Sequence, residues 1–128
     1  VIDYSDDNLG AAIAEAGAPD VILDTFADKY VKLDAEVAAP RARIIAIGNT
    51  GPEAPFPMGP GKFNDLRFQT MSMFNTPQTG AVLARLATLL TTGDIIPTVH
   101  QTYPLVETAA AQTAVLTESF VGKIVVTT

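Results

Sequence analysis

Short apolar runs alternate along this chain with longer segments in which apolar residues recur at helical spacing. The runs 21–23 and 43–47 have the continuous apolar character that is typical of strands buried on both faces. Between them, segment 29–39 places Tyr30, Leu33 and Val37 on one helical face and ends at Pro40. Such strand–helix–strand repeats predict an α/β fold with a mostly parallel sheet and flanking helices.

The other segments continue this pattern. A strand end is expected at 1–4 and a helix at 9–16, after polar residues that suit a helix start. A Pro/Gly-rich loop at 52–61 is longer than most connections and indicates a functional segment. Further on, the sequence predicts a strand at 68–74, a helix at 80–91, an extended segment at 95–103, a helix at 104–118 and a strand at 123–127.

The composition narrows the class of protein. Of 128 residues, 48% are apolar and 17% are charged, which separates the chain from disordered segments. A net charge of −6 disfavours a nucleic-acid partner, because binding phosphates requires a basic face. No apolar run approaches the roughly 18 residues that a membrane-spanning helix needs. We therefore expect a soluble, cytoplasmic protein with no nucleic acid and no membrane as partner.

Polar or aromatic groups stand where the expected strands end. These positions are 3–4, 24–25, 47–49 and 73–74. In parallel sheets, ligands bind beyond the carboxyl ends of the strands, so the positions could together line a nucleotide crevice. Ordinary strand ends are also polar, and the pattern alone leaves both interpretations open.

Six stretches of sequence carry a resemblance to a known family. They are Val-Ile-Asp-Tyr at 1–4, Asp-Val-Ile-Leu-Asp-Thr at 20–25, Ala-Pro-Arg-Ala-Arg-Ile-Ile-Ala-Ile-Gly-Asn at 39–49, Leu-Leu-Thr-Thr-Gly-Asp-Ile-Ile-Pro at 89–97, Tyr-Pro-Leu at 103–105 and Gly-Lys-Ile-Val at 122–125. In this order and spacing they resemble the C-terminal part of medium-chain dehydrogenases/reductases of the quinone-oxidoreductase-like, zinc-type alcohol dehydrogenase-like kind.

The resemblance implies a particular fold and chemistry. Residues 1–93 would be the later part of a doubly wound, Rossmann-like nucleotide-binding domain, and residues 94–128 would return toward a GroES-like catalytic domain that this sequence lacks. The implied activity is hydride transfer from NADPH to a small-molecule substrate, either a quinone or an activated carbonyl or alkene. The family also commonly forms homodimers by pairing an edge strand, here 68–74, across a two-fold axis.

Six residues match the family's cofactor-binding positions. Tyr4 would lie by the adenosine 2′-phosphate, and Ile47, Gly48 and Asn49 beside the nicotinamide ribose. Gly48 would let the backbone approach the ligand, and Asn49 would hydrogen-bond it. Met73 and Phe74 would form a wall of the nicotinamide pocket. Each assignment has a structural alternative. Tyr4 could be a half-buried tyrosine at a strand end, Gly48 and Asn49 a turn after a strand, and Met73 and Phe74 core residues.

Departures from the family pattern limit what this chain can do alone. Phe26-Ala27 and Arg41-Ala42-Arg43 replace glycine-containing turns, and no G-x-G-x-x-G turn opens a helix to hold the pyrophosphate. The first two Rossmann strands are absent, and the chain opens at Val1 without a methionine. We therefore expect a piece of a longer protein that is inactive and binds NADPH weakly or not at all by itself.

Other chemistry has little support. His100 is the single histidine and suits a structural or solvated role, and the chain has no cysteine, so neither a zinc site nor a hydrolase triad is indicated. Catalytic residues stay unassigned, and the resemblance favours zinc-free chemistry.

Two interpretations remain. One is a part of a working NADPH-dependent oxidoreductase, completed by a missing N-terminal part. The other is a non-catalytic fragment or degenerate dimerisation module that binds no cofactor. In the family's strand order, 3-2-1-4-5-6, the two absent strands separate strand 1–4 from strand 21–23. We expect strand 1–4 to stay there rather than pair Ile2 with Ile22.

Overall fold

The computed structural model describes residues 2–5 and 7–128, and the chain divides into two compact units, Val1–Pro77 and Gln78–Thr128. The expected functional division, with a nucleotide-binding part at 1–93 and a return segment at 94–128, stays a prediction.

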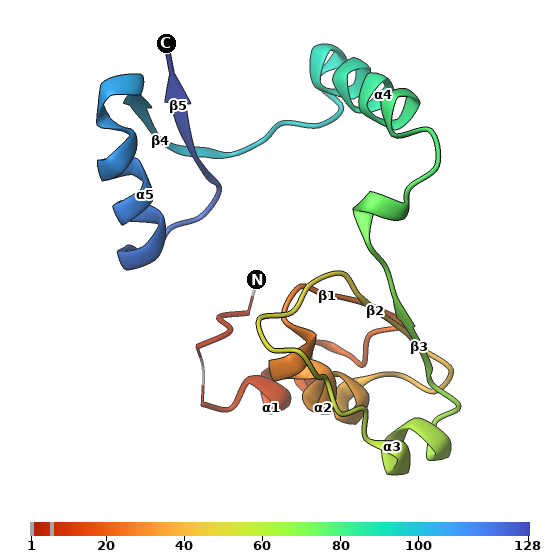
Figure 1. The fold of residues 1–128 in the computed structure, drawn as a ribbon. Coiled ribbons are helices and arrows are strands. Elements are labelled where there is room, and N and C mark those ends of the chain that lie inside the picture. Colours follow the sequence, from red (N-terminus) through yellow and green to blue (C-terminus); the bar gives the residue numbers. More distant parts are fainter. Residues whose placement is uncertain (1, 6) are drawn as a thin grey trace. The chain divides into compact units, whose positions relative to one another are not determined.

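The first unit contains a parallel three-stranded sheet. Its strands are β1 (Val21–Asp24), β2 (Arg43–Ala46) and β3 (Arg67–Thr70), in the order β1-β2-β3. Val21 pairs with Arg43, which pairs with Arg67, so all three strands run in register and end at the same edge. Helices α1 (Leu9–Ala16) and α2 (Ala27–Val37) lie side by side on the sheet (Figure 1). This arrangement confirms the parallel α/β fold predicted from the sequence.

Small side chains dominate the core of the first unit. Ile44, at the centre of β2, is the largest side chain that is completely buried. Val31 and Ala35 of α2 are buried with it, together with Ala42 and Ala46. Alanines at these places let α2 approach the middle strand closely, which holds the carboxyl end of β2 in a fixed position.

Two segments between residues 52 and 75 differ from expectation. The Pro/Gly-rich loop leads into a short helix, α3 (Met58–Phe63), and the Phe56 ring packs against Phe68 with centroids 5.1 Å apart. The strand expected at 68–74 ends at Thr70, and Met73–Asn75 form a 3₁₀ turn, η1. The Ser72 hydroxyl accepts the Phe74 backbone N–H (3.3 Å), which offers the backbone an alternative to the sheet ladder.

The strand expected at 1–4 is wrong for the residues described. Tyr4 and Ser5 form a turn in which the Asp3 carboxylate accepts both the backbone N–H (2.9 Å) and the hydroxyl (2.7 Å) of Ser5. Val1 lies outside the described residues. No ladder joins Ile2 to Ile22 in the described part of the chain, and β1 keeps one open edge. The family position expected for residues 1–4 stays a prediction.

The second unit is built around one parallel pair of strands. Helix α4 (Thr79–Thr92) ends at Gly93, whose φ of 79° is the left-handed conformation that favours glycine. Strand β4 (Val99–Pro104), the turn η2 (Leu105–Glu107), helix α5 (Thr108–Thr117) and strand β5 (Lys123–Thr127) follow, and β4 pairs with β5. The helix predicted at 80–91 and the strand predicted at 123–127 are confirmed, whereas the strand expected from 95 starts at Val99 and the helix expected from 104 starts at Thr108, after η2. Among the described residues, no helix is both long and apolar enough to cross a bilayer.

The position of Ile44 generates a prediction about stability. Ile44→Ala should lower the free energy of unfolding by about 2–5 kcal/mol, because it leaves a cavity under α2. Met58→Ala, at a side chain that is 73% exposed, is the matched control and should change stability by less than about 0.5 kcal/mol. Urea denaturation followed by circular dichroism measures both, and equal effects of the two variants would contradict the assignment of the core.

Candidate functional site

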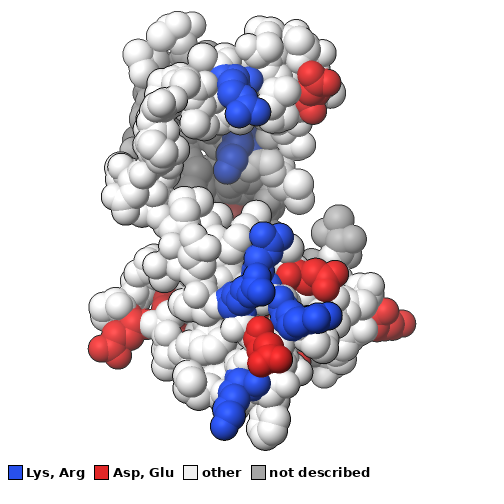
Figure 2. All heavy atoms as spheres, turned by 90° about the vertical axis from the view of Figure 1, so that its right-hand side faces the viewer, with Lys and Arg blue, Asp and Glu red and all other residues white. Residues whose placement is uncertain are grey.

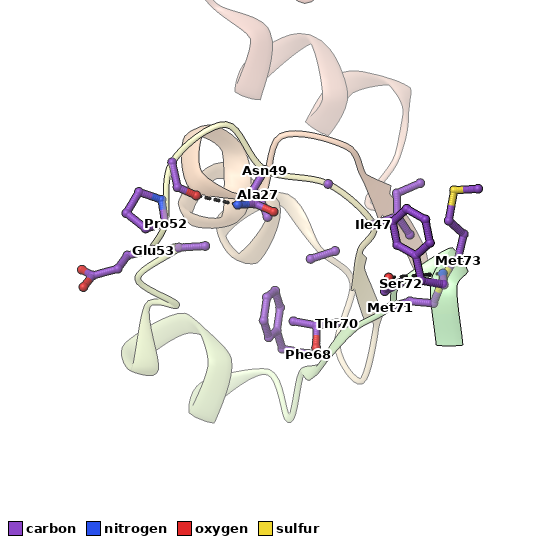
Figure 3. A pocket seen from close by; sticks show the side chains of 15 residues that line it. Ala27, Ile47, Asn49, Pro52, Glu53, Phe68, Thr70, Met71, Ser72 and Met73 are labelled. Carbon is purple, nitrogen blue, oxygen red and sulfur yellow. Dashed lines mark hydrogen bonds between the residues drawn. The ribbon is translucent and has the colours of Figure 1, made fainter. Parts of the chain in front are cut away.

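A pocket of about 490 Å³ lies at the carboxyl ends of β2 and β3, where a parallel sheet typically binds its ligand. Five of the six predicted site residues line it: Ile47, Gly48, Asn49, Met73 and Phe74. Figure 3 shows side chains from the ends of the two strands and from the loop after β2 around one hollow. The remaining lining residues are Ala27, Ala46, Gly51, Pro52, Glu53, Ala54, Phe68, Thr70, Met71 and Ser72.

Gly48 forms the back of this pocket and fits there only because it has no side chain. A Cβ atom at Gly48 would overlap the backbone carbonyl of Thr25, in the turn after β1. The Gly48 carbonyl also accepts the N–H of Ala27 (3.1 Å), and the backbone carbonyl of Asp24 accepts the N–H of Ile47 (2.8 Å). The turn after β1 and the turn after β2 are therefore locked together at backbone distance.

Asp28 clamps the loop that follows Gly48. Its carboxylate accepts the backbone N–H of Thr50 (2.7 Å), the Thr50 hydroxyl (2.7 Å) and the N–H of Gly51 (2.9 Å). The hydrogen bonds from Thr50 are the main reason that the pKa of Asp28 falls to about 2. Sequence reasoning missed this residue, because an acid in the first turn of a helix is common and nothing in the pattern showed that it would reach a loop 22 residues away.

The Asn49 side chain is partly engaged within the same loop. Its amide nitrogen donates to the carbonyl oxygen of Gly51 at 2.6 Å. A hydrogen bond from Asn49 to a ribose or amide, as predicted, would therefore use the side-chain oxygen as acceptor. That role stays a prediction.

The walls of the pocket are largely apolar. Ile47, Phe68, Met71, Met73 and Phe74 are the large hydrophobic residues that line it, and Glu53 is the one charged residue among the lining residues. Figure 3 shows the Glu53 carboxylate pointing away from the other labelled side chains. Such a pocket suits an uncharged ring and its sugar, and offers nothing to neutralise a phosphate.

Tyr4 does not belong to this pocket. It is 74% exposed and lines a second hollow of about 390 Å³ between α1, α2 and the open edge of β1. The structure thus separates the residue predicted for the 2′-phosphate from the five that gather at the first pocket. Its predicted role at the cofactor remains untested.

The described residues do not form a zinc site. No group of three or more His, Asp or Glu side chains is placed to hold a metal ion in this part of the chain, and the sequence has no cysteine. Figure 2 shows Lys and Arg directly beside Asp and Glu on the visible face of the first unit, so the charges there are mixed in sign.

Comparison with known proteins identifies the family. Residues 1–126 match the family model described as zinc-binding dehydrogenase. No match was found among curated proteins. The chain belongs to the zinc-binding dehydrogenase family, within the medium-chain dehydrogenase/reductase superfamily.

Solved structures show the same fold. An NAD-dependent alcohol dehydrogenase shares 18% identity at a TM-score of 0.81, over 99% of this chain and 37% of its own length. The enoyl reductase CurK shares 21% sequence identity with this chain at a TM-score of 0.70. The match covers 98% of this chain and 40% of CurK. An alcohol dehydrogenase from E. coli CFT073 (rspB), solved with NADH, shares 22% sequence identity at a TM-score of 0.71. The match covers 92% of this chain and 35% of that protein. The chain therefore spans about two-fifths or less of each of these proteins.

The Asp28 clamp generates a prediction about pH. A carboxylate whose pKa is lowered by hydrogen bonds keeps them above its ordinary pKa and loses them as the pH falls through the lowered value. The amide proton shifts of Thr50 and Gly51 should therefore titrate with a midpoint near pH 2, measured by NMR. In Asp28→Ala both amides should lose this titration and exchange faster at pH 7. Glu36→Ala, a matched loss of charge on the exposed face of α2, should leave them unchanged, and a midpoint near 4 would contradict the clamp.

Proposed function

We propose that this chain forms the nicotinamide end of an NAD(P)H site in an oxidoreductase of the medium-chain superfamily. The observation that carries the proposal is the pocket at the shared carboxyl end of β2 and β3, with Gly48 at its back and five predicted cofactor residues on its walls. Membership of the zinc-binding dehydrogenase family and the NADH bound to a protein of the same fold support it.

The residues present fit the uncharged part of such a cofactor. The bound cofactor would supply the hydride. Gly48 would allow the backbone to approach the ribose, and Ile47, Met71 and Met73 would exclude water from the ring. The mainly apolar lining and the outward-pointing Glu53 agree with this end of the molecule rather than with its phosphates.

The choice between the two nicotinamide cofactors is also a proposal. We favour NADPH, because Tyr4 matches the family tyrosine beside the 2′-phosphate and its phenol can hydrogen-bond a phosphate oxygen. The solved relatives include one described as NAD-dependent and one bound to NADH, which supports the broader class NAD(P)H. Hydride acceptance by a quinone or by an activated carbonyl or alkene, as in the enoyl reductase CurK, is the substrate class proposed.

A second candidate function rests on a specific absence. The chain contains no glycine-rich turn that opens a helix for a pyrophosphate, so by itself it could be a non-catalytic module that keeps the sheet and a dimer surface. Cofactor binding by the longer protein expected to carry this chain would separate the two candidates.

The cofactor proposal is tested by titration. The longer protein should bind NADPH more tightly than NADH, and Asn49→Ala should weaken NADPH binding about two- to tenfold through the loss of one hydrogen bond. Gly48→Val should abolish binding, because its side chain has no space beside Thr25. Glu36→Ala is the control with unchanged affinity, and fluorescence titration measures all four proteins.

Two results would contradict this assignment. If Asn49→Ala keeps both affinity and turnover, the loop after β2 is not part of the site. If the 128-residue chain alone binds NADPH with micromolar affinity, the pyrophosphate does not need a glycine-rich turn outside this chain.

A homodimer is proposed through the edge of the sheet at β3. This strand has one neighbour, and Met73 and Phe74 beyond it are 70% and 90% exposed. Pairing across a two-fold axis would satisfy its open backbone groups and cover these side chains. Phe68 is already half-buried against Phe56 and would contribute less than expected from the sequence.

The dimer is tested by sedimentation. The chain should sediment as a dimer at high micromolar concentration, and Thr70→Pro should make it monomeric, because the Thr70 N–H faces away from β2 and proline removes it from the open edge. Met58→Ala, at an exposed residue of α3, is the control and should leave the dimer intact. A strict monomer for the unchanged chain would count against the proposal.

A further inference from the structure

Two buried carboxyl groups lie directly behind the turn that supports Gly48. Asp24 ends β1 and is 6% exposed, and Asp34, in α2, is 9% exposed. Among the described residues, one oxygen of each carboxyl group, Oδ2, is buried without a hydrogen-bond partner. Two ionised groups in this position would each carry an unsatisfied charge and would repel each other.

A single shared proton would satisfy both orphaned oxygens. Oδ1 of Asp24 accepts the N–H of Phe26 at 2.7 Å, so Oδ2 is the oxygen of Asp24 that is left to accept a proton from Asp34. Burial first, then the hydrogen bond with Asp24 and its negative charge, raise the pKa of Asp34 to about 7. Below that pH, Asp34 keeps its proton and can donate it to Asp24.

No cation neutralises this pair. Neither carboxyl group forms an ion pair with Lys or Arg in the described part of the chain, and Asp24 is the charged group that acts on Asp34. The other titratable residues that line the adjoining hollow or belong to elements packed against α2 are Tyr4, Glu15, Tyr30, Arg43 and Lys62.

The pair is connected to the pocket through two hydrogen bonds. Oδ1 of Asp24 accepts the N–H of Phe26, and the next residue, Ala27, donates its N–H to the carbonyl oxygen of Gly48. Any change in the separation of the two carboxyl groups therefore shifts the turn 24–27 against the back of the pocket.

We propose that Asp24 and Asp34 are a proton-sharing pair of positioning residues that sets the turn 24–27 against Gly48, and thereby tunes cofactor binding by pH without touching the cofactor. The effect on cofactor binding rests on the function proposed above, whereas the effect on the turn does not. Because the pKa of Asp34 is raised in the folded state, the stabilisation is complete below the ordinary carboxyl pKa and is lost as the pH rises through about 7.

The test compares the unchanged protein with Asp34→Asn, whose amide donates to Asp24 at every pH. In the unchanged chain, protection of the Ala27 amide from hydrogen exchange should fall up to about tenfold between pH 6 and 8, after correction for the intrinsic rate. Asp34→Asn should keep its protection over this range, whereas Asp34→Ala should be poorly protected at both pH values. Asp20→Asn, at an exposed acid before β1, should retain the original profile.

NADPH affinity of the longer protein provides the second readout. It should fall over the same pH range in the unchanged protein and stay flat in Asp34→Asn. If no cofactor binds at any pH while the exchange profiles differ as described, the proposed function fails and the proton-sharing pair stands.

The opposite outcome overturns the pair. Identical exchange profiles for the unchanged chain and Asp34→Asn would show that no shared proton holds the turn. If Asp34→Asn does not fold, ¹³C titration of the aspartate side chains in the unchanged chain decides the question. One carboxyl group titrating near 7 supports the pair, and ordinary titration of both near 4 overturns it.

Discussion

The contact of Gly48 with the Thr25 carbonyl is the constraint on which the rest of the first unit depends. Parallel pairing in register brings the ends of β1 and β2 to the same edge, and the absence of a side chain at Gly48 lets the two turns meet at backbone distance. The Ala27 N–H then bonds to Gly48, which starts α2 at a fixed place over the sheet. The pocket, the Asp28 clamp and the buried carboxyl pair all surround this junction.

Periodicity was sufficient to predict the regular elements. The apolar runs gave β1 and β2, and helical spacing gave α1, α2 and α4, because burial on a sheet or helix face imposes those patterns. Periodicity did not predict where a polar side chain would replace a backbone hydrogen bond of a strand. Asp3 turned the expected first strand into a turn, and Ser72 helped to end β3 early, since short polar groups can replace ladder bonds.

The candidate site was predicted in part, for a similar reason. Residues at the ends of adjacent parallel strands must gather, so Ile47–Asn49 and Met73–Phe74 could be grouped in advance. Tyr4 was grouped with them as the end of an expected strand at 1–4 and by family resemblance, and in the structure it stands in a turn and lines another hollow. The Asp28 clamp and the Asp24–Asp34 pair are contacts between separate elements, and no spacing in the sequence encodes them.

The central claim, that the first pocket receives the nicotinamide end of the cofactor, can be tested on this chain through its three methionine methyl groups. Met71 and Met73 line the pocket, whereas Met58 lies in α3 outside it. The spectrum of the ¹³C-methyl-labelled chain should be recorded during titration with NADPH up to millimolar concentration, which detects even weak binding. The account predicts that the Met71 and Met73 signals shift together while Met58 stays fixed. Movement of the Met58 signal while the Met71 and Met73 signals stay fixed would contradict it.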